Sequence, residues 1–226
     1  MMNKILEMLR LQQELNNNTN GLNWEYGVTK NGKRINWKRC IYLEAGELID
    51  SYPWKHWKDI KAIPNYENIK IEIVDIWHFI MSEALRTYKV NNLGSIEDIA
   101  KSIVKMEEFK EFSQNSNCDN LDIYEQIRVV EDMIKTLFCK DDIKDLIGAF
   151  LIMSSKLNLK LTELYNLYIG KNILNKFRQR HGYKDGTYIK IWQGKEDNVV
   201  MQNILNSNSN ITPHNLYKKL EGSYPK

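Results

Sequence analysis

The sequence predicts an all-α protein, and three observations lead to this prediction. Apolar residues recur mainly at steps of three and four, which is the spacing of amphipathic helices. The periodic segments are separated by stretches rich in Asn, Gly, Pro or Ser, which end regular structure. Only the segment after His181 has alternating character, so almost nothing in the chain requires a sheet.

Eight helices are expected along the chain. They span residues 3–16, 37–50, 68–90, 95–112, 121–139, 142–157 and 162–180, followed by a short terminal helix that begins at Thr212-Pro213. Ser95 is the predicted N-cap of the fourth helix, because Asp98 three residues later gives a near capping box. Thr162 is the predicted N-cap of the seventh helix, and Pro213 takes the first position of the last one, where its missing N–H is tolerated.

The segments between these helices are predicted to be loops. The longer ones cover residues 17–36, 51–67, 114–120 and 206–210. The first of them is rich in Asn and Gly, with a short turn near Trp24. The second is an aromatic connector that Pro53 and Pro64 bracket, and the last is a low-complexity Asn/Ser linker.

Length and composition are those of a globular protein. The 226 residues, 42% of them hydrophobic, are expected to form one all-α domain over 1–226, in which 199–226 are a linker and a short C-terminal helix. The net charge of +3 does not indicate a nucleic-acid partner. Three widely spaced cysteines without a C-x-x-C argue against a disulfide framework and a thiolate metal site. No apolar run reaches the roughly 18 residues of a membrane span, so a cytoplasmic protein without a membrane partner is expected.

Two segments with the same spacing of acidic residues provide a candidate metal site. Glu44 and Glu47 lie three residues apart in the second predicted helix, and Glu72 and Asp75 do so in the third. Residues three apart share a helix face, so each helix presents two carboxylates at the edge of its apolar stripe. If the stripes pack antiparallel, the four acids converge, and a divalent cation would relieve the repulsion that raises their pKa values. Oxygen-only ligands favour Mg²⁺ or Mn²⁺, and the prediction is a helical bundle with a carboxylate metal site between two central helices.

A second candidate site begins at Lys171, where 25 residues carry a local net charge of +6. Lys171, Asn175 and Arg178 fall on one face of the predicted helix, and Tyr183 and Lys190 follow in a Gly-bounded loop. Cations and hydroxyls opposite a carboxylate–metal site suit a polyphosphate, because the metal and the basic side chains each neutralise part of its charge. The alternative is a solubilising helix face. A nucleic-acid patch is not expected, since the aromatic residues lie in a loop rather than along a sheet or groove.

The connector offers a third feature, a run of aromatic side chains. Trp54, His56 and Trp57 stand within four residues and provide rings on which a base can stack. Each tryptophan equally fits the role of a core anchor, and the sequence leaves both interpretations open.

These motifs resemble those of the all-α NTP pyrophosphohydrolases. The E-x-x-E and E-x-x-D pairs, the latter extended to E-x-x-D-x-x-H-F by His78 and Phe79, are similar to the signature of that superfamily. Within it the chain most resembles the dimeric dUTPases. Supporting segments are Leu11-Gln-Gln-Glu-Leu-Asn16, the Trp54–Trp57 connector, and the block from Lys171 to Glu196-Asp197-Asn198. Relatives tend to carry W-K-W-W where this chain has W-K-H-W, with His56 at the third position.

The resemblance implies Mg²⁺-dependent hydrolysis of dUTP, and also of dUDP, to dUMP with release of pyrophosphate or phosphate. It implies that two or more Mg²⁺ ions, for which Mn²⁺ would substitute, are held by Glu44, Glu47, Glu72 and Asp75. Glu47 would orient or deprotonate the attacking water. Phosphate or sugar would be bound by Lys171, Asn175, Arg178, Tyr183 and Lys190, the uracil edge by Gln12 or Gln13 with Asn16, and the base by stacking on Trp57 or His56. A homodimer is implied as well.

Three other interpretations are open at this point. A related pyrophosphohydrolase for dCTP or another nucleotide would carry the same four acids. A di-iron carboxylate bundle needs E-x-x-H on two helices, whereas this chain has one D-x-x-H, at Asp75 and His78. A non-catalytic helical module that has kept the fold would not need the intact acids and the intact basic block.

Overall fold

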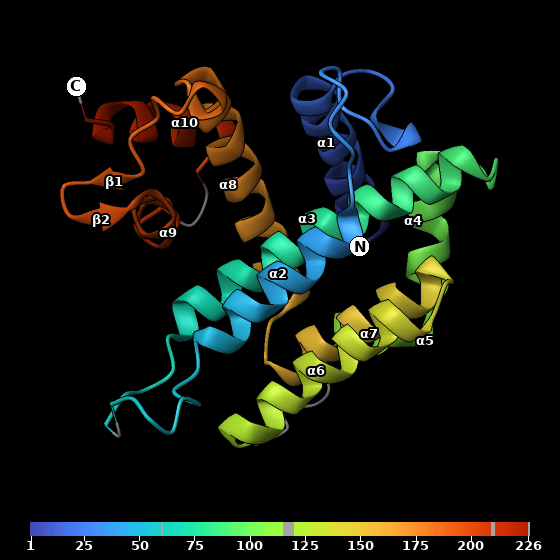
Figure 1. The fold of residues 1–226 in the computed structure, drawn as a ribbon, viewed down its shortest axis with the longest axis horizontal. Helices are drawn as coiled ribbons and strands as arrows, with labels where there is room; N and C mark the ends of the chain where they lie inside the picture. The colour runs from blue at the N-terminus through green and yellow to red at the C-terminus, as the bar shows by residue number, and fades with distance from the viewer. Residues whose placement is uncertain (60, 115–119, 209–210, 226) are drawn as a thin grey trace. The chain divides into compact units, whose positions relative to one another are not determined.

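The computed structural model describes residues 1–59, 61–114, 120–208 and 211–225, and within them the regular secondary structure is almost entirely helical (Figure 1). This confirms the all-α prediction. The helices are α1 (Met2–Asn20), α2 (Trp37–Asp50), α3 (Tyr66–Val90), α4 (Ile96–Lys105), α5 (Glu107–Gln114), α6 (Ile123–Cys139), α7 (Ile143–Lys156), α8 (Leu161–Arg180), α9 (Asp197–Asn206) and α10 (Pro213–Ser223). The described chain also has two 3-10 turns, η1 (Trp24–Tyr26) and η2 (Tyr183–Asp185), and a hairpin of β1 (Ile191–Trp192) and β2 (Lys195–Glu196).

The chain divides into two compact units, Met1–Leu164 and Tyr165–Lys226. The first unit holds α1 to α7 and the first turn of α8, and the second holds the rest of α8 with the hairpin, α9 and α10. The single domain expected from the sequence stays a prediction. The division into units reflects packing within each unit, and two such units can still fold together as one domain.

The pair α2 and α3 forms the centre of the first unit. The two helices lie side by side and run antiparallel, joined at one end by the aromatic connector (Figure 1). Their apolar stripes are buried, with Ile41 and Leu48 on α2 and Ile69 and Ile76 on α3. The antiparallel packing of the two stripes is the arrangement that brings carboxylates at their edges together.

The remaining helices of this unit cover the central pair. α1 packs against α3 and α4, α5 and α6 pack against α7, and α6 and α7 also contact α2 and α3 respectively. The ring of Trp77 on α3 stacks on Phe150 of α7 with 4.8 Å between the centroids. Apolar side chains on several sides bury α3, so its register is fixed by packing rather than by helix propensity alone.

The second unit is built around the part of α8 that follows Leu164. Gly170 lets α9 approach closely, since a Cβ at that position would lie 2.7 Å from Cδ1 of Leu205. Farther along, Phe177 is fully buried, and rings from the hairpin and from α10 surround it. The small core of this unit is therefore largely aromatic.

Three predicted helix boundaries are wrong. The first predicted helix does not end at residue 16, because α1 continues to Asn20 through part of the predicted loop 17–36. The sequence predicts one helix over residues 95–112, but the backbone of Met106 is extended and separates α4 from α5. The break allows α4 to pack on α1 while α5 packs on α7. Thr162 is not an N-cap, because the carbonyl of Lys160 already accepts from the N–H of Leu164 at 2.8 Å and α8 begins at Leu161.

The predicted capping box at the start of α4 is confirmed. The Ser95 side chain accepts from the backbone N–H of Asp98, and the Asp98 carboxylate accepts from the backbone N–H of Ser95. The prediction missed α9, however, where the sequence was expected to be irregular. Its Asn and β-branched residues are weak helix formers, so packing against α8, with Met201 buried, stabilises this helix.

Several expectations fall partly outside the described residues. The predicted loop 114–120 and linker 206–210 include 115–119 and 209–210, which lie outside them, as does Cys118. Cys40 and Cys139 are free thiols. Among the helices that the structure describes, none has the length and apolar character to cross a membrane.

Candidate active site

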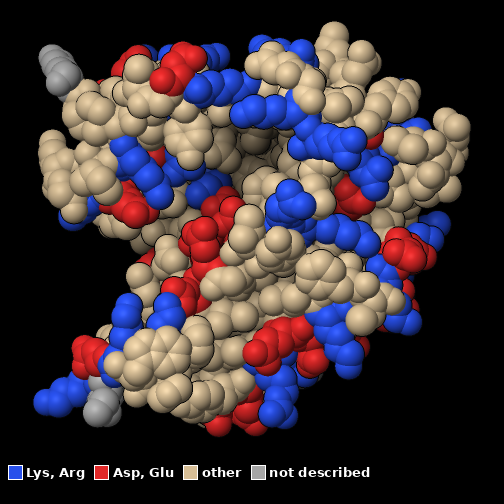
Figure 2. Space-filling view, viewed as in Figure 1, with Lys and Arg blue, Asp and Glu red and all other residues tan. Residues whose placement is uncertain are grey.

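Three of the four predicted acids form one carboxylate group on α2 and α3. Glu44, Glu72 and Asp75 each offer an oxygen, and these oxygens all lie within 4.8 Å of one another. Glu72 is buried with 6% of its surface exposed, while Glu44 and Asp75 are half-buried. Figure 2 shows acidic side chains gathered along the edge of the α2–α3 pair. The antiparallel packing predicted from the two stripes therefore brings three of the acids together.

The donor set of this group fits a magnesium ion. Mg²⁺ binds oxygen ligands at about 2.0–2.1 Å, so two oxygens on opposite sides of one ion are about 4.2 Å apart. Oxygens within 4.8 Å of one another need only small side-chain movements to reach such positions. Mg²⁺ commonly takes few carboxylates and keeps sites for water and phosphate, which three acids from two helices allow.

The fourth acid, Glu47, lies outside this group. It stands one turn beyond Glu44 on α2 and is exposed. It lines a pocket of about 510 Å³ between the end of α2, the connector and the start of α3. Lys55 and Lys58 line the same pocket, and a hydrogen bond from Lys55 to Asp50, 2.6 Å long, lowers the pKa of that carboxyl group.

Asn68 connects this pocket to the carboxylate group. Its Nδ2 donates to Oε1 of Glu72 at 3.0 Å and to Oγ of Ser51 at 2.8 Å. Ser51 in turn donates to the backbone carbonyl of Glu47 at 3.1 Å. One amide therefore orients the most buried acid of the group and ties it to the end of α2. Asn68 was not among the predicted site residues, although its position one turn before Glu72 places the two on the same helix face.

The aromatic connector exposes the ring predicted to stack on a base. Trp57 has 62% of its surface exposed, and its ring meets those of Trp54 and His56 edge-on, with centroids 5.5 Å and 4.9 Å away. Trp54 is held by a hydrogen bond from its Nε1 to Asp50, 3.2 Å long. Trp57 is therefore not a core anchor. Of the two interpretations left open by the sequence, only the stacking surface remains for this residue.

Gln12 and Asn16, two of the residues predicted to contact uracil, form part of a buried polar network between α1 and α3. Nε2 of Gln12 donates to Oδ1 of Asn16 at 3.2 Å and to Oγ of Ser82 at 3.0 Å. Asn16 also donates to Ser82, at 2.9 Å, and Nδ1 of His78 lies 2.6 Å from Oε1 of Gln12. All four residues are at least 96% buried. Such a network fixes the amide groups in one orientation.

Gln13 points away from this network. Its Nε2 donates to Oε1 of Glu25 at 2.8 Å and to Oδ1 of Asn17 at 3.1 Å. The sequence named Gln12 and Gln13 as alternatives, and the structure brings only Gln12 together with Asn16.

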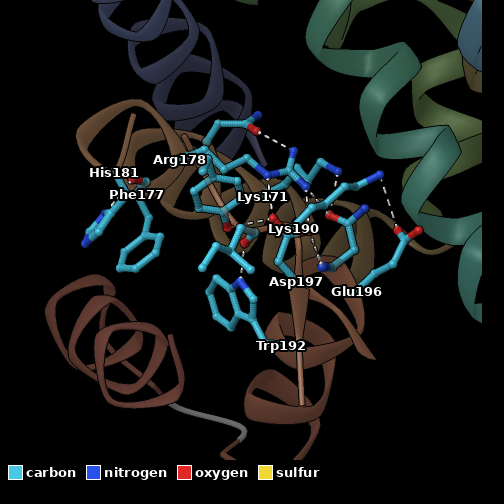
Figure 3. Close-up of polar contacts among 12 residues, drawn as sticks. Lys171, Phe177, Arg178, His181, Lys190, Trp192, Glu196 and Asp197 are labelled. Carbon is cyan, nitrogen blue, oxygen red and sulfur yellow. Dashed lines mark hydrogen bonds and ion pairs between the residues drawn. The ribbon is translucent and has the colours of Figure 1, made fainter. Parts of the chain in front are cut away.

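In the second unit, Arg178 is held by a buried carboxylate (Figure 3). Nε and Nη2 of Arg178 donate to the two carboxylate oxygens of Asp197, both at 2.7 Å. The hydroxyl of Tyr188 donates to the same carboxylate at 2.7 Å, as does the backbone N–H of Asn198 at 2.8 Å. Burial by itself would raise the pKa of Asp197, but the hydrogen bonds and charge of Arg178 outweigh it and lower that pKa.

The other predicted basic residues lie around this ion pair. Nζ of Lys171 donates to Oδ1 of Asn198 at 2.8 Å, and Asn175 accepts from Nη1 of Arg178 at 3.2 Å. The guanidinium carbon of Arg178 lies 5.7 Å from the ring centre of Tyr183, and Lys190 forms an exposed ion pair with Glu196 at 3.5 Å. The helix face and the loop predicted from the sequence therefore do meet within this unit.

Comparison with known proteins places the chain in a family. A family model described as dUTPase matches residues 4–183. The chain belongs to the dUTPase family. No curated protein matches it.

The dUTPase match includes α2 and α3 with their carboxylates, the connector and all of α8. It ends at Tyr183, so Lys190 and Asp197 follow the matched region. Sequence reasoning missed the role of Asp197. The signal available for it was an acidic residue close behind a basic block, since a buried arginine requires a charged partner.

If the carboxylate group of this dUTPase-family chain binds Mg²⁺, exchanging Asn68 for alanine should weaken that binding about tenfold, because Glu72 loses the amide that orients it. Titration calorimetry with MgCl₂ measures this directly. Asn91→Ala, at the C-cap of the same helix, is the matched control and should bind Mg²⁺ as the wild type does. Equal affinities for all three proteins would contradict the role given to Asn68.

Proposed function

We propose that the chain hydrolyses dUTP to dUMP and pyrophosphate, and dUDP to dUMP and phosphate, which keeps uracil out of DNA and supplies dUMP. The observation that carries the proposal is the carboxylate group of Glu44, Glu72 and Asp75 in a chain of the dUTPase family. In the reaction, the oxygen of water joins one phosphorus of the α–β phosphoanhydride. The bridging oxygen leaves with the other phosphorus, and one proton is released.

Glu44, Glu72 and Asp75 would hold the magnesium in this proposal, with Mn²⁺ as a substitute and two or more ions per site. Bound Mg²⁺ neutralises phosphate charge and polarises the phosphoryl group. The three side chains come from two helices that pack extensively against each other. Their oxygens therefore already lie close together before substrate binds.

Glu47 is the proposed general base. Its carboxylate is exposed and lines the pocket next to the carboxylate group, so it is accessible to water. In that position it would orient the attacking water and accept the proton that the water releases. Hydrolysis of this kind depends on positioning and charge neutralisation, and needs no covalent intermediate.

Recognition of the nucleotide is assigned to the remaining residues. Trp57, with His56 beside it, would stack on the base, and Gln12 or Gln13 with Asn16 would pair with the carbonyl and N–H groups of uracil. Phosphate or sugar contacts are assigned to Lys171, Asn175, Arg178, Tyr183 and Lys190. A homodimer, which the sequence resemblance implies, and a cytoplasmic location, which the composition predicts, complete the proposal.

A panel of nucleotides tests the choice of substrate. With Mg²⁺ present, pyrophosphate release from dUTP should exceed that from dTTP or dCTP by about 100-fold in kcat/KM, because fixed amide groups reject a base that they cannot pair with. A coupled assay for pyrophosphate measures the rates. Equal rates with dCTP would instead support a pyrophosphohydrolase of broader specificity, and no release from any nucleotide would exclude the proposed reaction.

A further inference from the structure

The backbone at Ile189 and Lys190 is fixed by three hydrogen bonds in the second unit. The N–H of Ile189 donates to the hydroxyl of Tyr224 at 3.1 Å, and its carbonyl accepts from Nε1 of Trp192 at 2.7 Å. The carbonyl of Lys190 accepts from the N–H of Asp197 at 3.0 Å. Two of the three partners come from the hairpin segment and α9, but Tyr224 comes from α10, 35 residues farther along.

The ring of Tyr224 is inserted among the aromatic residues of this unit. It stacks on Tyr188 with 5.5 Å between centroids and an interplanar angle of 21°. It also meets Trp192 and Phe177, each at 5.4 Å, and His181 at 4.9 Å. Figure 3 shows Phe177, His181 and Trp192 together on one side of the Arg178 cluster. Tyr224 therefore contacts both the end of α8 and the loop that follows it.

Helix α10 holds Tyr224 in this place. Tyr224 is the C-cap residue of α10, and its N–H donates to the carbonyl of Leu220 at 3.0 Å. Leu220 and Leu216 are buried, and they anchor the helix on its unit. The hydroxyl of Tyr224 is consequently presented to Ile189 by a helix and not by a freely moving segment.

The loop between Gly182 and Trp192 needs such support from outside. Gly182 and Gly186 both adopt positive φ on either side of η2, and residues 187–190 belong to no helix or strand. Ile189 is 43% exposed, so burial of its own side chain does little to fix the backbone there. Without the hydrogen bond from Ile189, the backbone beside Lys190 would have more conformations to lose when substrate binds.

We propose that Tyr224 is a positioning residue for substrate binding, which acts by fixing the loop that carries Tyr183 and Lys190. The inference rests on the proposed function, in which these two residues contact the phosphate or sugar. Tyr224 lies beyond residues 4–183, the region that the dUTPase family model matches. It does not touch substrate in this proposal, so its removal should raise KM for dUTP and leave kcat nearly unchanged.

Tyr224→Phe is the decisive variant, because it keeps the ring and removes only the hydroxyl that accepts from Ile189. KM for dUTP should rise about threefold, the effect expected from losing one hydrogen bond of modest strength. Hydrogen exchange of the Ile189 amide should become faster in the same variant. The control is Tyr217→Phe on the same helix, whose ring lies 5.4 Å from Phe177. It should change neither KM nor that exchange rate.

A double-mutant cycle with Lys190→Ala tests whether Tyr224 acts through the loop. If it does, Tyr224→Phe should add little to the KM of Lys190→Ala, whereas independent effects would multiply and overturn the inference. Wild-type turnover with an unchanged KM in Tyr224→Phe would overturn this inference alone. Absence of dUTP hydrolysis by the wild type would overturn the proposed function and this inference with it.

Discussion

Glu47→Gln should abolish dUTP hydrolysis while Mg²⁺ binding is largely kept, and Glu72→Gln should abolish both. Glu47 is exposed and outside the carboxylate group, so its amide variant removes a base and leaves the three ligand oxygens in place. Loss of a general base costs about 10² to 10⁴ in rate. Glu72 is the buried member of the group, and an amide there halves its oxygen donors and removes its charge.

Two measurements on the same purified proteins separate these effects. Steady-state kinetics with dUTP report turnover, and the rise in melting temperature on adding Mg²⁺ reports metal binding without any substrate. Circular dichroism should show an unchanged helical fold in both variants. Glu131→Gln, an exposed glutamate on α6, is the control and should match the wild type in every assay.

The two variants also distinguish the two roles predicted for Glu47, metal ligand and general base. If Glu47→Gln loses the Mg²⁺-dependent rise in melting temperature as completely as Glu72→Gln does, Glu47 is a metal ligand that moves into the group when the ion binds. If Glu47→Gln keeps full activity, it is neither base nor ligand, and the proposed chemistry at this site is wrong.

The sequence predicted the central part of the fold because local patterns decide it. The bounds of α2 are as predicted, and α3 begins only two residues before its predicted start, since Asn36 and Asn65 cap them and their apolar stripes match the helical period. The convergence of Glu44, Glu72 and Asp75 follows from the same stripes once the helices pack antiparallel. The position of Glu47 does not, because one turn of α2 decides whether an acid faces α3 or the connector pocket.

What the sequence could not show depends on contacts between distant residues. The helix α9 consists largely of residues with low helix propensity, and it is stabilised by packing against α8, which approaches it at Gly170. The partners of Gln12 on α3 are 66 and 70 residues away in the sequence. Asp197 lies 19 residues after Arg178, with which it forms the buried ion pair. Periodicity shows which residues share a face of one helix, but it does not show which side chain another helix or loop will bring to that face.

Exchanging Asp197 for asparagine should destabilise the second unit by about 3–5 kcal/mol, the usual cost of leaving a buried charge without its partner. Asp197 is fully buried and Arg178 has 9% of its surface exposed, so water cannot readily replace the lost carboxylate. An asparagine keeps one acceptor oxygen, whereas Arg178 and Tyr188 together direct three donors at this side chain. Urea unfolding followed by tyrosine and tryptophan fluorescence measures the loss. Asp185→Asn, an exposed aspartate of η2, should be neutral.

The difference in free energy of unfolding between the wild type and Asp197→Asn should depend on pH with a definite sign. The pKa of Asp197 is lowered in the folded chain, so its carboxylate stabilises the fold above the usual aspartate pKa of about 3.9. That contribution is lost as the pH falls through the lowered pKa, because the folded state must then take up a proton. The free energy of unfolding of the wild type should therefore exceed that of Asp197→Asn by a constant amount from pH 7 to about 5, and the difference should shrink in more acidic solution. A difference that stayed constant down to pH 2, with both proteins still folded, would mean that the charge of Asp197 is not what holds Arg178 in place.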